Sequence, residues 1–347
     1  METTKVKKET KNKIRVDFER APLSVRLKQK FLSMDFLVNV VFKIFRFILL
    51  VGVSYVILYP YIAKIFASFM SISDFKDVTV ILISKSPTLE QYKYIITDNG
   101  YFLALLNTFL LSLSVALIQT VVCALVAYGL AKFKFKGNNI IFFLVIFTMM
   151  VPQEALMYAM DTFFATFSKH NVIGMLLSSM GAIGEYGFEN TMAPLYILSF
   201  LGLGFKNGLF IFMLRQFFKG VPDELEESAY VDGSSTMRTF FTIIIPLAIP
   251  MLVTVFIFSF AWTWTDDFYS TIFFDSTYEG AMKYMSDIAV VPESLEKYTN
   301  SGTSYANVYS SAITGTASIL IILPLLIAYI FVQNKIVQGI ERSGIVG

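Results

Sequence analysis

The fold of this chain is decided by a segment that runs Val221-Pro-Asp-Glu-Leu-Glu-Glu-Ser-Ala-Tyr-Val-Asp-Gly233 and continues to Ile243-Ile-Ile245-Pro246. Pro222 suits the first position of a helix, and the acids after it suit the positive helix N-terminus. Gly233 supplies the backbone freedom to end that helix and turn. The segment predicts a short helix, a sharp turn and a second helix, although a run of acids is also typical of a solvated loop.

The composition around this segment is that of a membrane protein. Of the 347 residues, 55% are apolar and only 16% are charged, whereas an ordinary soluble domain carries about 25% charge. The mean hydropathy is +0.63. With 35 phenylalanines the chain could not cover a water-exposed surface with polar groups. It is predicted to cross a membrane several times.

Six stretches are long and apolar enough to cross about 30 Å of hydrocarbon as helices. They are approximately 46–70, 103–131, 139–160, 191–217, 243–265 and 312–334. Several carry prolines, which membrane helices tolerate as kinks. The predicted fold class is all-α, a polytopic bundle of six transmembrane helices.

The basic residues predict the orientation of this bundle. With both termini in the cytoplasm, 20 of the 28 lysines and arginines lie on the cytoplasmic side and 6 lie outside. Such a bias sets the orientation of membrane proteins. The chain is therefore expected to be a multi-pass membrane protein with the N- and C-termini in the cytoplasm.

The spans divide the chain into four parts. Residues 1–45 form a basic cytoplasmic segment, 46–99 the first span and an extracytoplasmic loop, 100–335 the transmembrane core and 336–347 a cytoplasmic tail. From Leu23 the first part reads as an amphipathic helix. It either lies on anionic membrane lipid or makes a regulatory contact.

Several kinds of site are excluded because the chain has only one cysteine and one histidine. The one cysteine, Cys123, excludes a disulfide framework and a CxxC metal site, and the one histidine excludes a histidine-rich metal centre. The chain has no GxxxxGK[ST] motif for nucleotide phosphates. We expect no metal, no cofactor and no catalytic residue in this chain, and therefore no enzyme activity of its own.

The spacing of the segment at 221–246 is more specific than its composition. Glu227-Ser-Ala229, Asp232-Gly233 two residues later, and Ile243-Ile-Ile245-Pro246 after nine more resemble the EAA loop of ABC importer permeases. The usual loop has alanine at Ser228 and leucine at Ile245, and both changes are mild in size. The resemblance implies the type I importer permease fold, in which this loop forms a helix that docks on a separate ATPase. The residues to which it assigns this coupling are Glu226, Glu227, Ser228, Ala229, Asp232, Gly233 and Pro246.

Other motifs point to the carbohydrate branch of that family. Asn107-Thr108, Ala127-Tyr-Gly-Leu-Ala131, Met150-Val-Pro152 and Leu214-Arg-Gln-Phe-Phe218 resemble conserved runs of that branch, of which the maltose G-type subunit is the nearest in pattern. The resemblance covers roughly residues 100–347. It implies a second homologous permease subunit, two ABC ATPase subunits that carry ATP and Mg²⁺, and an extracytoplasmic substrate-binding protein. Nucleic acid is not an expected partner.

Polar groups inside the predicted spans are candidates for the translocation pathway, because such groups are costly in a membrane. These candidates are Glu154, Lys206, Asn207, Trp264 and Asp266. Each has a plainer interpretation. The charges and the amide could be structural, and tryptophan near an interface is usually an anchor. Gly202, Gly204 and Gly208 are explained by close helix packing.

The connection between the last two spans, about Phe274 to Ser304, is long for two helices that only need joining. It is net acidic and rich in tyrosine, including Tyr278, Tyr284 and Tyr298. It is either a solvated hairpin or, as the maltose G-type resemblance implies, a loop that contacts the binding protein.

The sequence therefore predicts a permease subunit of an ATP-driven importer for a sugar or an oligosaccharide. An ABC permease for a non-sugar solute is the nearest alternative. A stand-alone secondary transporter would leave the EAA-like loop unexplained, and a membrane enzyme would need clustered catalytic side chains. The sequence does not identify the sugar.

Overall fold

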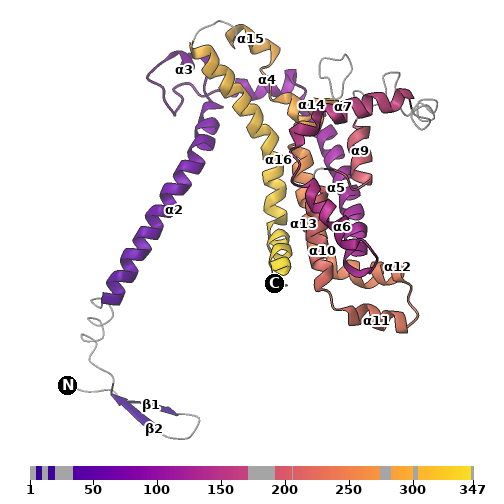
Figure 1. Ribbon diagram of the computed structural model, residues 1–347. Coiled ribbons are helices and arrows are strands. Elements are labelled where there is room, and N and C mark those ends of the chain that lie inside the picture. The colour runs from indigo at the N-terminus through magenta and orange to yellow at the C-terminus, as the bar shows by residue number, and fades with distance from the viewer. Residues whose placement is uncertain are drawn as a thin grey trace. The chain divides into compact units, whose positions relative to one another are not determined.

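The computed structural model describes residues 5–9, 15–19, 34–170, 192–204, 206–273, 283–299 and 304–344, most of which are helical (Figure 1). The chain divides into two compact units, Met1–Phe66 and Ala67–Gly347. The division falls inside the part of the chain that was expected to hold the first span and its following loop.

The first unit contains a small hairpin and most of one long helix. Strands β1 (Lys5–Glu9) and β2 (Arg15–Glu19) pair antiparallel, a feature that was not predicted. Helix α2 (Met34–Ala67) begins twelve residues before the predicted span. None of its most apolar window is buried, so this surface is free to face lipid or another subunit. Most of the predicted amphipathic helix, residues 23–33, lies outside the described residues.

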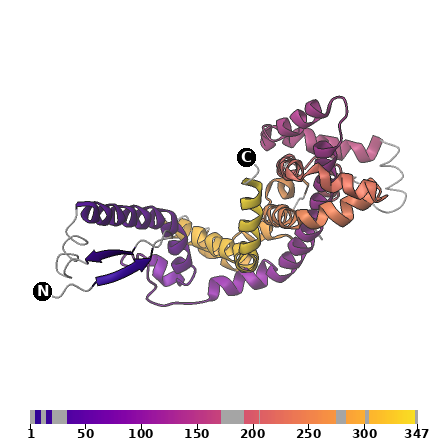
Figure 2. The same ribbon diagram turned by 90° about the horizontal axis from the view of Figure 1, so that it is seen from below.

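The second unit is built on α5 (Tyr101–Lys132), α10 (Asn207–Gly220), α13 (Ile245–Trp264) and α16 (Ser304–Gly344). Helix α13 packs against α5, α10 and α16, and α10 packs against α5 (Figure 2). The other elements are α3 (Ile72–Lys76), α4 (Glu90–Asp98), α6 (Asn138–Thr148), α7 (Gln153–His170), α9 (Ala193–Phe200), α11 (Asp223–Val231), α12 (Thr236–Thr239), the π-helix η1 (Phe240–Ile244), α14 (Phe268–Phe273), the 3-10 helix η2 (Met285–Ile288) and α15 (Glu293–Thr299).

The predicted all-α membrane fold is confirmed, but the count of six spans is not confirmed. In the described residues, four helices are long and apolar enough to cross a membrane, in α2, in α5, in α12 with η1 and α13, and in α16, and a bent pair of helices would make a fifth. The predicted span at 139–160 is the pair α6 and α7, bent by 99° at a break that contains Pro152. The predicted span at 191–217 is two shorter helices, α9 and α10.

Close packing explains one of the glycines in this region. A Cβ atom on Gly208 would lie 2.8 Å from Met149 Cγ and 2.9 Å from the Val145 carbonyl oxygen, closer than real side chains allow. Helices α6 and α10 therefore approach each other at a point where only glycine fits, as the spacing of glycines predicts.

Two of the apolar cores of the second unit lie at different positions along the bundle. One lies between α5, α10 and α13 and includes Phe210, Leu214, Phe218 and Phe240. The other joins α4, η2, α15 and the first turns of α16, and includes Ile95, Met285, Ile288 and Tyr309. We call α3, α4, η2 and α15 the cap. The cap and α11 lie at opposite ends of the bundle (Figure 1).

Candidate functional site

The segment that was predicted to contact an ATPase forms α11, a turn and α12 at the end of the bundle. Pro222 precedes the helix, and Gly233 ends it with φ +81°. The Gly233 amide donates to the Tyr230 carbonyl, and the Ser234 amide donates to the Ala229 carbonyl at 2.9 Å. Ser235 then caps α12 by accepting from the Arg238 amide. These bonds satisfy the helix ends locally, so the turn needs no support from another segment.

Helix α11 is fixed to the end of α5 by Lys132. The Lys132 ammonium lies 2.6 Å from Asp223 Oδ1 and 3.5 Å from Glu226 Oε1, and it donates to the Val221 carbonyl at 2.7 Å. The hydrogen bond from the Lys132 ammonium to the Asp223 carboxylate holds the pKa of Asp223 below its usual range. The Tyr128 hydroxyl also donates to Glu226, whose side chain is buried. Glu226 and Ala229 therefore face the bundle rather than solvent.

The opposite side of α11 is exposed and partly apolar. Glu227, Ser228 and Asp232 are exposed there, and so is Pro246 at the start of α13. Five large apolar side chains are exposed on α11, α12 and η1. One of them, Tyr230, interacts with Tyr128 of α5. We call the other four the apolar face: Leu225, Val231, Met237 and Phe241. Val231 is 88% exposed, an unfavourable place for valine in a monomer in water. A surface of this kind marks an interaction site.

A cavity of about 240 Å³ lies where α9 meets α13 and α14. Polar side chains supply much of its lining: Gln119, Gln153, Lys206, Ser259, Thr263, Thr265, Asp266 and Asp267. Pockets for drug-sized ligands are usually about 300–1,000 Å³. The cavity is therefore too small to enclose an oligosaccharide in this conformation.

Two of the predicted pathway residues, Lys206 and Asp266, line this cavity together. The Lys206 ammonium lies 5.3 Å from the centroid of the Trp262 ring, which also lines it. Asn207 is fully buried beside Gly204, and neither polar atom of its side chain has a hydrogen-bond partner among the described residues. Aromatic, cationic, acidic and amide groups thus gather at the break between α9 and α10.

The other two predicted pathway residues lie elsewhere. The Trp264 indole donates to the Ile321 carbonyl of α16 at 3.0 Å and is buried in the core beside the cap. Glu154 is exposed on α7 and does not line the cavity, although its neighbour Gln153 does.

Sequence reasoning missed Gln119, which ties three helices together at the cavity. Its Nε2 donates to Ser199 of α9 at 3.2 Å, and its Oε1 accepts from Ser259 of α13. An amide inside an apolar span is itself a signal of a polar partner. Gln119 could have been selected by the same criterion as Asn207.

The tyrosine-rich connection between α14 and α16 is part of the cap. Tyr284 is buried, Tyr298 is half-buried, and Tyr278 lies outside the described residues. Asn99 donates to the carbonyls of Ile288 and Val290, both at 3.0 Å. The described part of this connection is therefore a packed structure and not a free hairpin.

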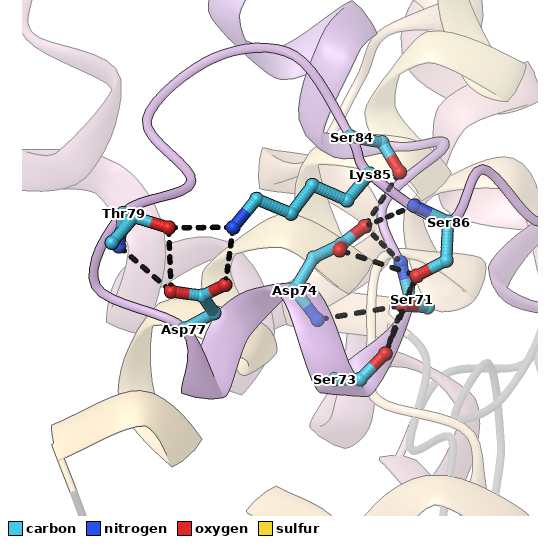
Figure 3. A network of polar contacts seen from close by, with 8 residues as sticks. All are labelled: Ser71, Ser73, Asp74, Asp77, Thr79, Ser84, Lys85 and Ser86. Carbon is cyan, nitrogen blue, oxygen red and sulfur yellow. Dashed lines mark hydrogen bonds and ion pairs between the residues drawn. The ribbon is translucent and has the colours of Figure 1, made fainter.

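A polar network orders the loop from α3 to Ser86, also in the cap (Figure 3). Asp74 accepts hydrogen bonds from the side chains of Ser84 and Ser86 and from the backbone amide of Ser71. These bonds lower the pKa of Asp74. A second, exposed group joins Asp77 to Lys85 at 2.6 Å and to Thr79.

Three comparisons place this architecture among known proteins. Residues 119–342 match the family model described as "Binding-protein-dependent transport system inner membrane component". The maltodextrin transport system permease protein MalD of Streptococcus pneumoniae is 28% identical over 302 residues, which are 86% of this chain and 93% of that protein. The arabinooligosaccharides transport system permease protein AraQ of Halalkalibacterium halodurans is 25% identical over 85% of this chain and 93% of that protein.

The fold also matches a solved structure. A bacterial ABC transporter involved in the import of the acidic polysaccharide alginate has a chain that superposes with a TM-score of 0.63 at 19% identity, over 87% of this chain and 98% of that one. The family model covers more than half of the present chain. The chain therefore belongs to the binding-protein-dependent transport system inner membrane components, and it is a multi-pass membrane subunit of a transporter.

Proposed function

We propose that this chain is one of two permease subunits of an ATP-driven importer for a sugar or an oligosaccharide. The observation that carries the proposal is α11, a short helix fixed to α5 by Lys132 that exposes an apolar face away from the bundle. A helix held at one side and uncovered at the other suits a contact that transmits force. The names of the relatives, which transport maltodextrin and arabinooligosaccharides, support the class of substrate.

The subunit needs partners to complete this function. A separate ATPase pair would bind ATP and Mg²⁺ and would cover the apolar face, with Glu227, Ser228 and Asp232 at its edge. A binding protein would deliver the solute at the cap, where Val290, Glu293 and Glu296 are exposed. These assignments place the N-terminus and α11 in the cytoplasm, as the distribution of basic residues predicts.

The cavity at the α9–α10 break is the proposed contribution to the translocation pathway. Trp262 offers an aromatic face, and Lys206, Asp266 and Gln119 offer groups that can hydrogen-bond to hydroxyls. Because the cavity is small, a second permease subunit would supply the other half of the pathway. The chain itself performs no covalent chemistry in this proposal.

The coupling role is tested by Gly233→Val in the complete importer reconstituted in liposomes. Valine at φ +81° is strained by roughly 1–2 kcal/mol, which disfavours the turn after α11 about tenfold. We expect ATP-driven uptake to fall by about that factor while the subunits still assemble. Gly137→Val is the matched control, because Gly137 also has positive φ and open space around it. Equal uptake by the two variants would contradict the coupling role of α11.

The substrate class is tested separately, with the unaltered importer and its binding protein. Labelled maltodextrin, arabinooligosaccharide, uronate oligosaccharide and a peptide are offered one at a time. We expect ATP-dependent accumulation of at least one of the saccharides and none of the peptide. Accumulation of the peptide alone would favour the non-sugar alternative.

A further inference from the structure

A second cavity lies where α5 ends, α6 begins and α10 ends, beside Lys132. Its volume is about 500 Å³. The lining is dominated by basic, amide and aromatic residues: Phe133, Lys134, Phe135, Lys136, Asn138, Asn139, Arg215 and Lys219, with Leu130 and Ala131. No acidic residue of the described part of the chain lines it. The proposed transport function assigns no role to this cavity.

The cations of this cavity form no ion pair with a carboxylate of the described residues, although the charge of Lys134 helps to lower the pKa of Asp223. Lys132, one turn away, is paired with Asp223 and Glu226. In contrast, no carboxylate of the described chain forms an ion pair with Lys134, Lys136, Arg215 or Lys219. Four cations around one cavity repel each other, and an anion bound among them would remove that cost.

Arg215 is the buried member of this group, with 5% of its surface exposed. Its guanidinium carbon lies 3.6 Å from the centroid of the Phe142 ring, and its Nε donates to the Leu130 carbonyl at 3.2 Å. The stacking and the hydrogen bond fix the plane of the guanidinium. The bond uses one of its five N–H donors. A fixed planar guanidinium suits the oxygens of a phosphate group.

The first turn of α6 adds to the same preference. The helix starts after Gly137, so its N-terminal amides and the positive end of its dipole lie beside the lysines. Asn138 donates to the carbonyls of Leu130 and Phe133, and its Oδ1 is buried with no hydrogen-bond partner among the described residues. That oxygen can accept from a hydroxyl group. A ligand with both a phosphate and a hydroxyl would satisfy the site.

The surroundings favour a lipid over a free phosphate. Phe133 and Phe135 alternate with the lysines and are 47% and 44% exposed. From the cavity onward α6 exposes a continuous series of apolar side chains: Ile140, Ile141, Phe143, Leu144 and Phe147. A basic pocket beside such a surface has the arrangement that binds a phospholipid headgroup and its acyl chains.

We propose that this cavity binds one anionic phospholipid of the leaflet on the α11 side, with the phosphate held by Arg215 and the lysines and the acyl chains along α6. A hydroxylated headgroup such as that of phosphatidylglycerol meets Asn138. The proposal stands independently of the solute that the importer carries.

The test uses the complete purified importer in a zwitterionic detergent, titrated with phosphatidylglycerol or phosphatidylcholine and examined by native mass spectrometry. The variant Lys134→Gln/Lys136→Gln/Lys219→Gln removes three cations of the cavity. We expect it to retain phosphatidylglycerol at least about tenfold more weakly, since each basic residue near a membrane surface contributes to such binding. The control Lys43→Gln/Arg46→Gln/Arg238→Gln removes three exposed cations that do not line the cavity, and it should retain the lipid normally. Equal losses in the two variants would overturn the proposal.

Two further measurements separate this lipid from other ligands. Inorganic phosphate, added in excess, should not displace phosphatidylglycerol from the unaltered complex, and displacement would mean that the site takes free phosphate instead. The variant Lys136→Cys should not cross-link to the other subunits. An efficient cross-link would show that a protein occupies the cavity. If the triple variant fails to assemble, Arg215→Lys in its place keeps the charge and should still weaken retention of phosphatidylglycerol. Unchanged retention in that variant would overturn the role of the guanidinium.

Discussion

At the cap, Asn99 is hydrogen-bonded to carbonyls 189 and 191 residues further along the chain, whereas at the other end of the bundle α11 is held mainly through one lysine. The cap also buries Met285, Ile288 and Leu295 completely, and each such side chain contributes about 1.5–3 kcal/mol. Around α11 five large apolar side chains stay exposed. The described side chains of the cap are thus packed within this chain, while those around α11 leave apolar surface uncovered.

The largest expected effect concerns Lys132, the main anchor of α11. Lys132→Met leaves Glu226 buried without its ammonium partner, a change that costs about 3–5 kcal/mol when such a pair is broken. We expect a clear fall in the melting temperature of the importer and a loss of ATP-driven uptake. Lys43→Met, at an exposed lysine of α2, is the control. Lys132→Met/Glu226→Gln should regain stability, and a double variant no better than the single one would argue against this pair as the anchor.

The next effect concerns the cap. Gln91 donates to the carbonyls of Ala67 and Met70 and accepts from Thr316, all within 3.0 Å. Gln91→Leu leaves these buried groups unpaired, at a cost of about 1–3 kcal/mol for each. We expect a lower melting temperature but an unchanged ratio of ATP hydrolysed to solute transported. Gln216→Leu, at an exposed position, should change neither. An altered ratio in Gln91→Leu would show that the cap takes part in coupling.

A smaller effect is expected from acid. Because hydrogen bonds lower the pKa of Asp74 in the folded state, its contribution to stability is present above the unfolded pKa of about 3.9 and is lost as the pH falls through the folded pKa. The melting temperature should therefore drop more steeply below about pH 4 in the unaltered importer than in Asp74→Asn. Parallel pH curves for the two proteins would mean that this network does not stabilise the cap.

The smallest effect is expected at Asp77, which pairs with Lys85 on the surface of the same loop. Exposed ion pairs contribute little, because water and salt screen them. Asp77→Asn should leave the melting temperature unchanged at physiological salt. A fall in melting temperature as large as that caused by Asp74→Asn would mean that the Asp77 network stabilises the loop as much as the Asp74 network does.

Much of this architecture could be predicted from short-range patterns. The helix, turn and helix at 221–246 follow from Gly233 and the acids before it, and the apolar runs predict most of the long helices. The contacts that hold α11 could not be predicted, because Lys132 and Glu226 are 94 positions apart and neither has a local signature of its partner. Hence Glu226 was assigned to a partner ATPase although it faces the bundle.

The predictions of single spans at these positions were wrong for a related reason. Hydropathy measures whether a stretch can enter a membrane, and it does not register where a helix stops. The stretch 191–217 is predominantly apolar, yet Gly202 has φ +72° and the helix ends there. Trp264 was likewise assigned to the pathway because its partner, the Ile321 carbonyl, belongs to the backbone of a distant helix and has no mark in the sequence.

The break between α9 and α10 has a consequence for biogenesis. Helix α10 has 14 residues and is about 21 Å long, so it does not cross the hydrocarbon by itself. The insertion machinery, which responds to hydropathy, meets residues 191–217 as one apolar stretch. Ser199, just before the break, accepts a hydrogen bond from Gln119, which was synthesised earlier, and Gln119 in turn accepts from Ser259, which is synthesised later. The segment can therefore reach its final shape only after α13 has entered the membrane, so that maturation follows insertion here.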